Sequence, residues 1–573
     1  MLLTYPTLLH ALSRNALNKD AEKKGFSFIH NNELDYEFIS FCDLYQKASA
    51  IATTLEHLRG EPVMLLFSTG KEFIQALLAC WSAGIIAVPC PVPQRPSQLK
   101  RLQQMALRDG INKIIISEKT HSRISKRFNL FNVSGFDFIW WEALCNTKEN
   151  SRSLTLPHAD DIALIQYTSG STAQPKGIVI THGNFAANCQ IIQQAFALTE
   201  KDCSVCWVPH YHDMGLVDGL LEPIYTGFHS VHIPATLFLQ SPSLWLKAIH
   251  RFNATYTGAP NFAYDLCVKK IRAEDVASFP APSLKVMYNA AEPIQWKTIE
   301  RFAETFGHLG YPLSKHNAGY GLAEATLAVS FSKLHEEPFF FLADLEKFNS
   351  GIVEPRDRGK EMVACGLPGA YTTVRIADED SNFLPDGKIG HVWISSPSVA
   401  HNGYWRNKTA TAETFVTKND DEADRLWLKT GDLGFMQNNH LFITGRKKDL
   451  IKIHGQNIYP QDIELTAIEA LPEHALGRNA AFQIEKDGGP KVVLVQEVSK
   501  NLSETIYHAI IQKISHAIFA EHGISIYDIL LVPKTEVLVT TSGKVQRRFN
   551  KLRYEAGHFF ILFSLHKNKF SHA

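Results

Sequence analysis

The sequence lacks the features that mark secreted, membrane-spanning and polyanion-binding proteins. Its nine cysteines are scattered over 573 residues without a pairing rhythm, which favours a reducing compartment over a disulfide framework. Basic and acidic side chains number 58 each, so neither a nucleic-acid-binding surface nor an acidic tail is indicated. No apolar run reaches the roughly 20 residues that span a bilayer, and the first residues lack the basic lead of a secretory signal. We therefore expect a cytoplasmic protein with no transmembrane segment and no nucleic acid partner.

The chain is too long for one ordinary core, so we expect several domains. Short apolar runs such as "VMLLF" and "DIALIQY" alternate with longer segments of helical period, which is typical of an α/β fold. Three of these runs end in polar clusters, "TSGST", "NAAEP" and "NAGYGLAE". Because ligand sites in α/β sheets lie where strands end, the three clusters predict one crevice.

The pattern changes twice further along the chain. From about residue 370 it becomes short strands with turns, and after "GRKKD" it becomes a short α+β segment. We therefore predict a large N-terminal domain, 1–447, with α/β subdomains and a small β subdomain. A small α+β domain, 448–573, follows it.

The loop "YTSGSTAQPKG", 167–177, concentrates glycines, hydroxyl side chains and a lysine after an apolar run. Glycine lets backbone N–H groups converge on an anion, and Ser and Thr add donors, so the loop is typical of a phosphate site. The P-loop pattern is not met, because Gly177 follows Lys176 where a hydroxyl residue is required. A plain polar turn between two elements is the alternative interpretation.

Seven strings in order give the chain a resemblance to a known family. They are the loop just described, "YHDMG" at 211–215, "GYGLAEAT" at 319–326, "GYW" at 403–405, "KTGDLG" at 429–434, "ITGRKKDLIKIHGQNIYPQDIE" at 443–464 and "TTSGKVQRR" at 540–548. Together they resemble the adenylate-forming superfamily, which includes acyl-CoA synthetases, firefly luciferases and peptide-synthetase adenylation domains. The resemblance covers essentially the whole chain and implies a large adenylation domain followed by a small, mobile C-terminal lid domain.

The resemblance assigns roles to three catalytic side chains. Lys544 matches the lysine that contacts the reacting carboxylate and the α-phosphate, Glu324 matches a magnesium-binding glutamate, and His212 lies at the mouth of the acyl pocket. Without the resemblance, Lys544 reads as an exposed lysine in a Ser-Gly turn and Glu324 as a favourable charge at a helix start. A metal role for His210 and His212 by alternate spacing lacks a third ligand.

The resemblance also implies a nucleotide site. Asp432 and Arg446 are expected to hold the ribose, and Tyr320 to lie against adenine opposite the loop 289–293. The expected nucleotide-binding residues are Thr168, Ser169, Gly170, Ser171, Thr172, Lys176, Ala291, Glu292, Tyr320, Gly321, Asp432 and Arg446. Lys448 matches the hinge about which the small domain turns. Mg²⁺ is the expected cofactor, and ATP a substrate.

The acid is expected to be a medium- or long-chain fatty acid. The segment "ATYTGAPNFAYDL" supplies small residues beside Phe262 for an apolar pocket, and it offers no charged partner for an amino group. We expect the acyl pocket to include His212, Gly258, Phe262 and Asn289. Activation of an amino acid is thereby disfavoured.

The identity of the molecule that accepts the acyl group is suggested by a long stretch before "GLPG". This stretch is an insertion at about 335–361 and contains three consecutive phenylalanines. Loops of this length usually have a function or are disordered. With the other strings, it resembles the fatty acyl-AMP ligases, in which an insertion restrains the small domain and the adenylate passes to the phosphopantetheine arm of an acyl carrier protein. Two alternatives stay open: a fatty acyl-CoA synthetase with a decorated surface loop, and an adenylate-binding regulator without catalysis.

Overall fold

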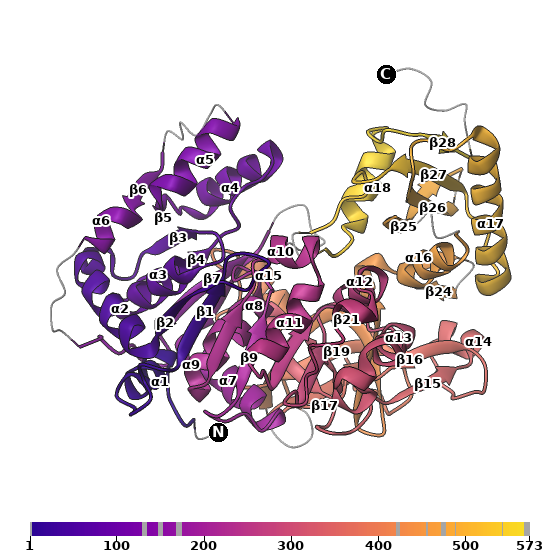
Figure 1. The fold of residues 1–573 in the computed structure, drawn as a ribbon. Coiled ribbons are helices and arrows are strands. Elements are labelled where there is room, and N and C mark those ends of the chain that lie inside the picture. The colour runs from indigo at the N-terminus through magenta and orange to yellow at the C-terminus, as the bar shows by residue number, and fades with distance from the viewer. Residues whose placement is uncertain are drawn as a thin grey trace.

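The computed structural model places a large body beside a small C-terminal domain (Figure 1). The residues that the structure describes are 3–128, 135–146, 153–167, 175–419, 424–453, 456–471, 477–487, 489–540 and 543–565. The body contains two large sheets and a smaller β layer, and the small domain has a sheet of its own.

The nine-stranded sheet of the body is parallel in its centre and antiparallel at both edges. Its strands, in spatial order, are β17 (Leu367–Pro368), β14 (Ala328–Phe331), β13 (His316–Gly321), β12 (Val286–Asn289), β11 (Tyr256–Ala259), β9 (Cys203–Cys206), β10 (His229–His232), β1 (Gly25–Ile29) and β2 (Tyr36–Ser40). The central strands are buried almost throughout, as expected of parallel strands with both faces covered.

The six-stranded sheet is parallel except for its last strand, which returns as a hairpin. Its strands, in spatial order, are β6 (Asp137–Trp140), β5 (Lys113–Ile116), β3 (Pro62–Leu66), β4 (Ile86–Pro89), β7 (Ile162–Tyr167) and β8 (Gly177–Thr181). The hairpin β7–β8 carries the glycine-rich loop at its tip, where Tyr167 pairs with Gly177.

One core joins the two large sheets through the helices between them. Phe26 of β1, Leu65 of β3, Leu77 of α3 and Phe185 of α7 belong to the same buried cluster. The helices of the body are α1 (Leu8–Ala16), α2 (Phe41–Leu55), α3 (Lys71–Ser82), α4 (Pro96–Asp109), α5 (Glu118–Phe128), α6 (Trp141–Cys145), α7 (His182–Ala195), α8 (Asp213–Leu216), α9 (Glu222–Thr226), α10 (Ala235–Gln240), α11 (Ser243–Arg251), α12 (Asn261–Lys270), α13 (Trp296–Phe306), α14 (Leu345–Asn349) and α15 (Lys408–Thr414). A second core lies under α11, α12 and α13, on the other face of the nine-stranded sheet.

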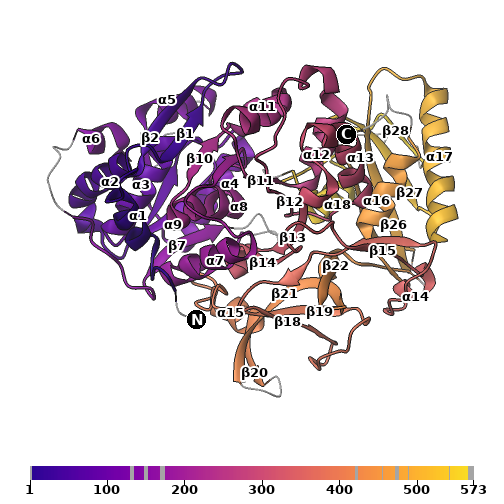
Figure 2. The ribbon, with the colours of Figure 1, turned by 60° about the horizontal axis from the view of Figure 1, so that its bottom comes forward.

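The smaller β layer of the body consists of antiparallel strands. Its five-stranded sheet comprises β18 (Thr373–Ala377), β19 (Gly390–Ser395), β20 (Phe415–Asn419), β21 (Asp424–Gln437) and β22 (His440–Arg446). A separate two-stranded sheet, β15 (Phe340–Ala343) with β16 (Lys360–Val363), lies inside the stretch that the sequence marks as an insertion. In Figure 2 this pair runs toward the small domain.

After residue 448 the chain forms an α+β unit with its own buried cluster, built on residues such as Ile463, Leu494 and Ile514. Its elements are the strands β23 (Ile451–Ile453), β24 (Gln456–Ile458), β25 (Asn479–Lys486), β26 (Gly489–Val498), β27 (Asp528–Pro533) and β28 (Phe563–Ser564), with the helices α16 (Pro460–Glu469), α17 (Glu504–His522) and α18 (Arg547–Glu555). The apolar segment near the end of the chain docks on this unit, since β28 pairs with β27. None of the helices in the described ranges is long and apolar enough to cross a bilayer.

Candidate active site

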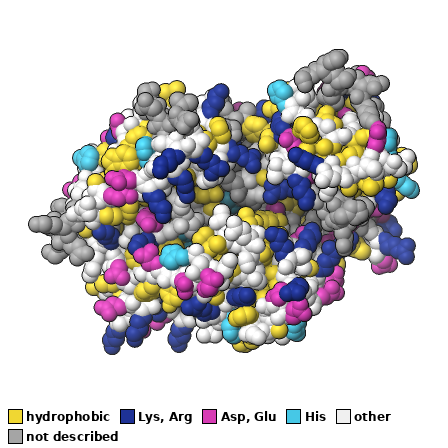
Figure 3. Space-filling view, turned by 45° about the horizontal axis from the view of Figure 1, so that its top comes forward, with side chains coloured by type: hydrophobic (Ala, Val, Ile, Leu, Met, Phe, Trp, Pro, Cys, Tyr) yellow, Lys and Arg dark blue, Asp and Glu magenta, His cyan; other side chains and the backbone are white. Residues whose placement is uncertain are grey.

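A cavity of about 2040 Å³ lies between the body and the small domain. The loops after β12 and β13 reach it, as do Tyr167 and Lys176, which flank the glycine-rich segment, so the described polar strand ends converge as predicted. Lys and Arg side chains gather along the edges of the groove in Figure 3. A cavity with cationic edges suits an anionic ligand such as a nucleoside triphosphate.

The glycine-rich loop is seen only at its two ends. Thr168, Ser169, Gly170, Ser171 and Thr172 lie outside the described residues, so their predicted phosphate contacts stay a prediction. Lys176 is described, and its Nζ lies 4.6 Å from the centre of the Tyr404 ring. Burial lowers the pKa of Lys176, and the nearby Lys448 ammonium lowers it further.

Glu324 shares this part of the cavity with Lys176. The Tyr404 hydroxyl donates a 3.0 Å hydrogen bond to Glu324 Oε1. Burial raises the pKa of Glu324, whereas Arg446 and the Tyr404 hydroxyl act to lower it. The carboxylate therefore lies beside a lysine and an arginine at the cavity wall.

Asp432 and Arg446 meet across the hairpin β21–β22, where they are paired residues. Arg446 Nε lies 3.0 Å from Asp432 Oδ1, and the Tyr320 hydroxyl donates a 2.6 Å hydrogen bond to Asp432 Oδ2. The Asp432 charge raises the pKa of Arg446, although burial opposes this shift. A carboxylate offers about four lone-pair sites, so Asp432 can still accept two hydroxyl groups. Tyr320 and its neighbour Gly321 both line the cavity.

The loop after β12 carries Ala291 and Glu292 into the cavity wall. Ala291 has a φ of +72°, an uncommon backbone conformation for a residue with a Cβ. Glu292 Oε1 accepts a 2.5 Å hydrogen bond from the backbone N–H of Phe262, a predicted acyl-pocket residue. Burial raises the pKa of Glu292 to about 7, while the Phe262 N–H and the Lys544 ammonium oppose the shift.

Two predicted acyl-pocket residues, Gly258 and Asn289, differ from the prediction, because neither lines the cavity. A Cβ at Gly258 would lie 2.0 Å from the Tyr288 ring, so that ring occupies the space beside the glycine. Asn289 is fully buried and donates a 2.9 Å hydrogen bond to Asn261 Oδ1. The cavity wall is formed here by Tyr288 and Asn261 instead.

His212 and Asp213 lie side by side at the start of α8, with 2.7 Å between His212 Nδ1 and Asp213 Oδ1. Burial acts to raise the pKa of Asp213, but His212, Lys544 and the Met214 N–H outweigh it and lower the pKa to about 2. His210 points elsewhere, since its Nε2 lies 3.1 Å from His232 Nδ1 in the buried core. Within the described part of the chain, no group of three or more His, Cys, Asp or Glu side chains is placed to hold a metal ion.

Lys544 comes from the small domain and reaches this group of body residues. Its loop is closed by a bridge between Val539 and Val545 and by a 2.8 Å hydrogen bond from Thr540 N–H to the Lys544 carbonyl. Burial lowers the pKa of Lys544, as does Arg446, whereas the three carboxylates nearby raise it. Those carboxylates are Asp213, Glu292 and Asp432. The side chain is open to the solvent of the cavity yet enclosed by protein on its other sides.

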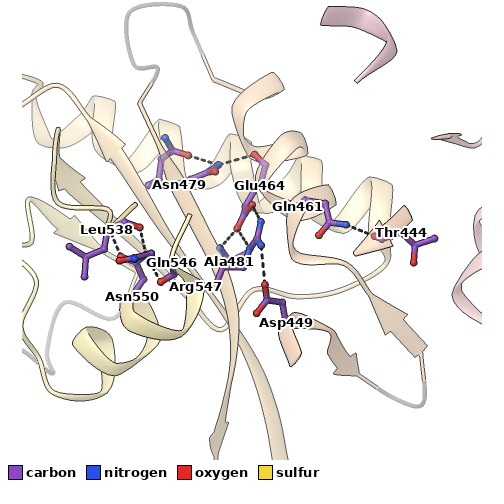
Figure 4. A network of polar contacts seen from close by, with 11 residues as sticks. Thr444, Asp449, Gln461, Glu464, Asn479, Ala481, Leu538, Gln546, Arg547 and Asn550 are labelled. Carbon is purple, nitrogen blue, oxygen red and sulfur yellow. Dashed lines mark hydrogen bonds and ion pairs between the residues drawn. The ribbon is translucent and has the colours of Figure 1, made fainter. Parts of the chain in front are cut away.

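A polar network anchors the Lys544 loop inside the small domain (Figure 4). Arg547, at the start of α18, donates two hydrogen bonds of 2.8 and 2.6 Å to Glu464 of α16. It donates a third, of 3.2 Å, to Asp449, which follows the predicted hinge residue Lys448. Glu464 also accepts the backbone N–H of Ala481. Sequence reasoning missed Arg547, because its partners lie 83 and 98 residues away in the chain.

The insertion lies between the body and the small domain. On the body side, Phe340 stacks on Trp296 with ring centroids 3.9 Å apart and planes at 15°. On the other side, Lys360 is ion-paired with Asp462 of α16, and its Nζ lies 4.7 Å from the Tyr459 ring. The run of three phenylalanines pointed to packing, whereas nothing in the sequence identified Lys360.

Comparisons with known proteins agree with this geometry. The family model described as "AMP-binding enzyme" matches residues 15–405, and a model described as "Disco-interacting protein 2-like, AMP domain" matches residues 448–559. The medium-chain-fatty-acid–[acyl-carrier-protein] ligase JamA of Moorena producens is 34% identical to this chain, and the alignment covers 96% of each.

Two solved structures have similar folds. One, from structural and functional studies of fatty acyl-adenylate ligases from E. coli and L. pneumophila, has a TM-score of 0.86 at 30% identity over 97% of this chain and 99% of that one. The other, a fatty acyl-adenylate ligase from L. pneumophila in complex with acyl adenylate and pyrophosphate, has a TM-score of 0.73 at 32% identity over 98% of both chains. The chain therefore belongs to the AMP-binding enzymes of the adenylate-forming superfamily.

Proposed function

We propose that this enzyme activates a medium- or long-chain fatty acid with ATP, forming fatty acyl-AMP and pyrophosphate, and passes the acyl group to an acyl carrier protein. The observation that carries the proposal is the position of Lys544, which the small domain places beside Asp213, Glu292 and Asp432 of the body. The names of JamA and of the L. pneumophila structure support the substrate and the product.

The reaction brings two anions together. A carboxylate oxygen of the fatty acid attacks the α-phosphorus of ATP, the bond from that phosphorus to the bridging oxygen breaks, and pyrophosphate leaves with its electron pair. Lys544 and Arg446 offset the repulsion between these anions and stabilise the charge that spreads over the α-phosphate in the transition state. Lys176, at the end of the glycine-rich loop, faces the part of the cavity proposed for the outer phosphates.

The nucleotide is held by the body in this proposal. Asp432 accepts the ribose hydroxyls, Arg446 approaches the same sugar, and Tyr320 covers the adenine opposite Ala291. All four residues line the cavity. We place the domain boundary at the hinge Lys448, so that the body holds both substrates and 448–573 delivers the lysine.

Glu324 is the residue proposed to hold Mg²⁺. The site fits an ion that takes most of its ligands from phosphate oxygens and water, because it offers one carboxylate and no dedicated cluster of ligands among the described residues. When bound, Mg²⁺ would neutralise charge on the triphosphate. Tyr404 fixes the carboxylate by donating to one of its oxygens.

The apolar part of the cavity supports a fatty acid. Its wall contains Ile192, Phe196, Met214, Leu327, Ala328 and Phe331. An amino acid substrate would need a free acidic partner near the reacting carboxylate, and Asp213 is already paired with His212. His212 marks the mouth of this part of the cavity, next to Lys544.

The insertion supports a carrier protein over free CoA as acceptor in this proposal. Its contacts hold the small domain where Lys544 reaches the body. Phe340 and Lys360 would therefore oppose the turn that thioester formation requires, and a docked carrier protein, unlike free CoA, offers a binding surface that can offset this restraint. The cytoplasmic location stays a prediction from composition.

The test supplies purified enzyme with ATP, Mg²⁺ and dodecanoic acid, then adds CoA to one half and a phosphopantetheinylated carrier protein to the other. Mass spectrometry identifies the products, and Lys544→Ala serves as the inactive control. We expect acyl-AMP that persists with CoA and is consumed by the carrier protein. Rapid acyl-CoA formation would replace the proposal with a fatty acyl-CoA synthetase, and adenylate binding without turnover would indicate a regulator.

A further inference from the structure

The helix that follows His212 contains an irregular turn beside the acyl part of the cavity. The segment from Asp213 to Thr226 runs through α8, a π-helical turn at Val217–Leu221, and α9. Such turns are uncommon and are frequent at functional sites. Here the π-turn presents Asp218 to the cavity, where only 6% of the residue is exposed.

Two tyrosines hold the Asp218 carboxylate from neighbouring strands. The Tyr256 hydroxyl, on β11, donates to one oxygen, and the Tyr288 hydroxyl, on β12, donates a 2.5 Å hydrogen bond to the other. Their rings are stacked with centroids 5.6 Å apart. Gly258 makes this arrangement possible, because any side chain there would collide with the Tyr288 ring.

The rest of this region is apolar. Phe196 packs against Tyr256 and Phe331, with ring centroids 5.5 and 5.2 Å apart. Burial raises the pKa of Asp218 to about 6, although the two tyrosine hydroxyls act to lower it. The Asp218 carboxylate therefore lies among aromatic side chains in this part of the cavity wall.

Asp218 shares the cavity wall with Phe196, Tyr256 and Tyr288. Asp213, five residues earlier on the same helix, lies near Lys544. At a rise of about 1.5 Å per residue, Asp218 is roughly 7 Å further along the helix axis. Because Lys544, Asp218 and the apolar residues Phe196 and Phe331 line one cavity, a fatty acid with its carboxylate at Lys544 can extend its chain along this wall to Asp218.

We propose that Asp218, held by Tyr256 and Tyr288, is a specificity-determining residue that distinguishes acyl chains by the polarity of their far end. This inference rests on the proposed function. A methyl-ended chain that reaches Asp218 removes water from a carboxylate and returns no hydrogen bond, which is unfavourable. A chain with a hydroxyl group at that point donates to a remaining lone-pair site of the carboxylate.

The experiment compares octanoic, dodecanoic and hexadecanoic acids with their ω-hydroxy counterparts in the wild-type enzyme and in Asp218→Asn. Adenylate formation gives a ratio of kcat/KM for the hydroxylated over the plain acid of each length. Asparagine keeps the shape and can bond both tyrosines, but it removes the charge. We expect one chain length at which the ratio exceeds one in the wild type and falls about tenfold in the variant, since hydrogen bonds to charged groups are the stronger ones.

Asp202→Asn is the matched control, because Asp202 is equally buried, is bonded to Thr199, Thr255 and Lys285, and does not line the cavity. Its ratios are expected to equal those of the wild type. Wild-type ratios below one at every length, ratios unchanged in Asp218→Asn, or an equal change in the control would each overturn the inference.

The two proposals fail in different ways. Adenylate formation from any acid of the series supports the proposed function, whatever the ratios are. If no acid is adenylated, the proposed function fails, and calorimetric binding of the same acid pairs still decides the inference: the hydroxylated acid must bind more tightly to the wild type than to Asp218→Asn, and equal binding contradicts it.

Discussion

At the residue scale, the surroundings of Lys544 shift its pKa in opposite directions. Three carboxylates surround it and raise its pKa, while enclosure by protein and Arg446 lower it. A charge that is already oriented before the reaction needs no reorganisation in the transition state. The residue is therefore suited to catalysis more than to ground-state binding.

Lys544→Ala should slow adenylate formation by about 10²- to 10³-fold or more while ATP still binds, because the lost charge acts mainly in the transition state. Pyrophosphate release measures the rate, and calorimetry measures ATP affinity. Lys534→Ala is the control, since Lys534 is an exposed lysine of the same domain. A Lys544→Ala enzyme with near-normal pyrophosphate release would refute the role of this lysine.

Glu292 gives a prediction about pH and stability. Its pKa in the folded enzyme is about 7, raised from an ordinary value of 4.5. The folded state therefore holds its proton more tightly than the unfolded state, and the associated stability is present at low pH and lost as the pH rises through 7. Glu292→Gln cannot ionise and keeps an acceptor for the Phe262 N–H.

We expect Glu292→Gln to gain about 1–3 kcal/mol of unfolding free energy relative to the wild type between pH 4.5 and pH 8. Denaturant unfolding at several pH values measures this difference. Glu304→Gln, an exposed site on α13, should show no such trend. Parallel stability curves for Glu292→Gln and the wild type would show that burial does not raise the Glu292 pKa.

At the scale of elements, the insertion contacts both the body and the small domain. Phe340 meets the body through Trp296, and Lys360 meets the small domain through Asp462 and Tyr459. The Lys360 side chain is 11% exposed and the Asp462 side chain 25% exposed. Solvent and salt therefore screen this pair less than an ordinary surface ion pair. It is the point at which one substitution can loosen the insertion from the small domain.

Lys360→Met should raise the rate of CoA thioester formation several-fold, because the small domain can then leave its closed position more often. Adenylate formation should change much less. The matched control is Lys347→Met, which removes an ion pair to Glu354 within the insertion itself. No gain in acyl-CoA from a folded Lys360→Met enzyme would show that the insertion does not restrain the turn through this contact.

The fold class could be predicted from the sequence, whereas the side chains that line the cavity could be predicted only in part. The order of the motifs predicted the family and the α/β fold class, and both are confirmed. That Gly258 and Asn289 do not line the cavity was not predictable, because it depends on which face of a short strand meets the cavity. Asp218 gave no signal either, since a π-turn shifts the helical periodicity by which side chains are assigned to faces.

At the scale of the whole molecule, the cavity belongs to both the body and the small domain. A ligand that fills it should therefore stabilise both parts together. A non-hydrolysable acyl-adenylate mimic at about 100 times its Kd should add about 2.7 kcal/mol to the unfolding free energy. Calorimetry should show one transition at a higher temperature, with slower proteolysis near Lys448.

AMP alone is the control for this prediction, because it lacks the acyl chain and the mixed anhydride. At an equal multiple of its own Kd, AMP should stabilise the body and leave cleavage near Lys448 nearly unchanged. Equal protection of that segment by AMP and by the mimic would mean that the nucleotide alone closes the two parts on each other.

The bonds of Arg547 have a mechanical consequence. They tie the Lys544 loop to α16 and to Asp449, one residue beyond the hinge. A rotation of the small domain about Lys448 would then move Lys544 as the end of a rigid lever, because the Arg547 bonds link the Lys544 loop to the residue next to the hinge. Lys544 would move away from the adenylate when the domain turns and would return to the same position when it turns back. The placement of the lysine would therefore be the same at the start of each turnover.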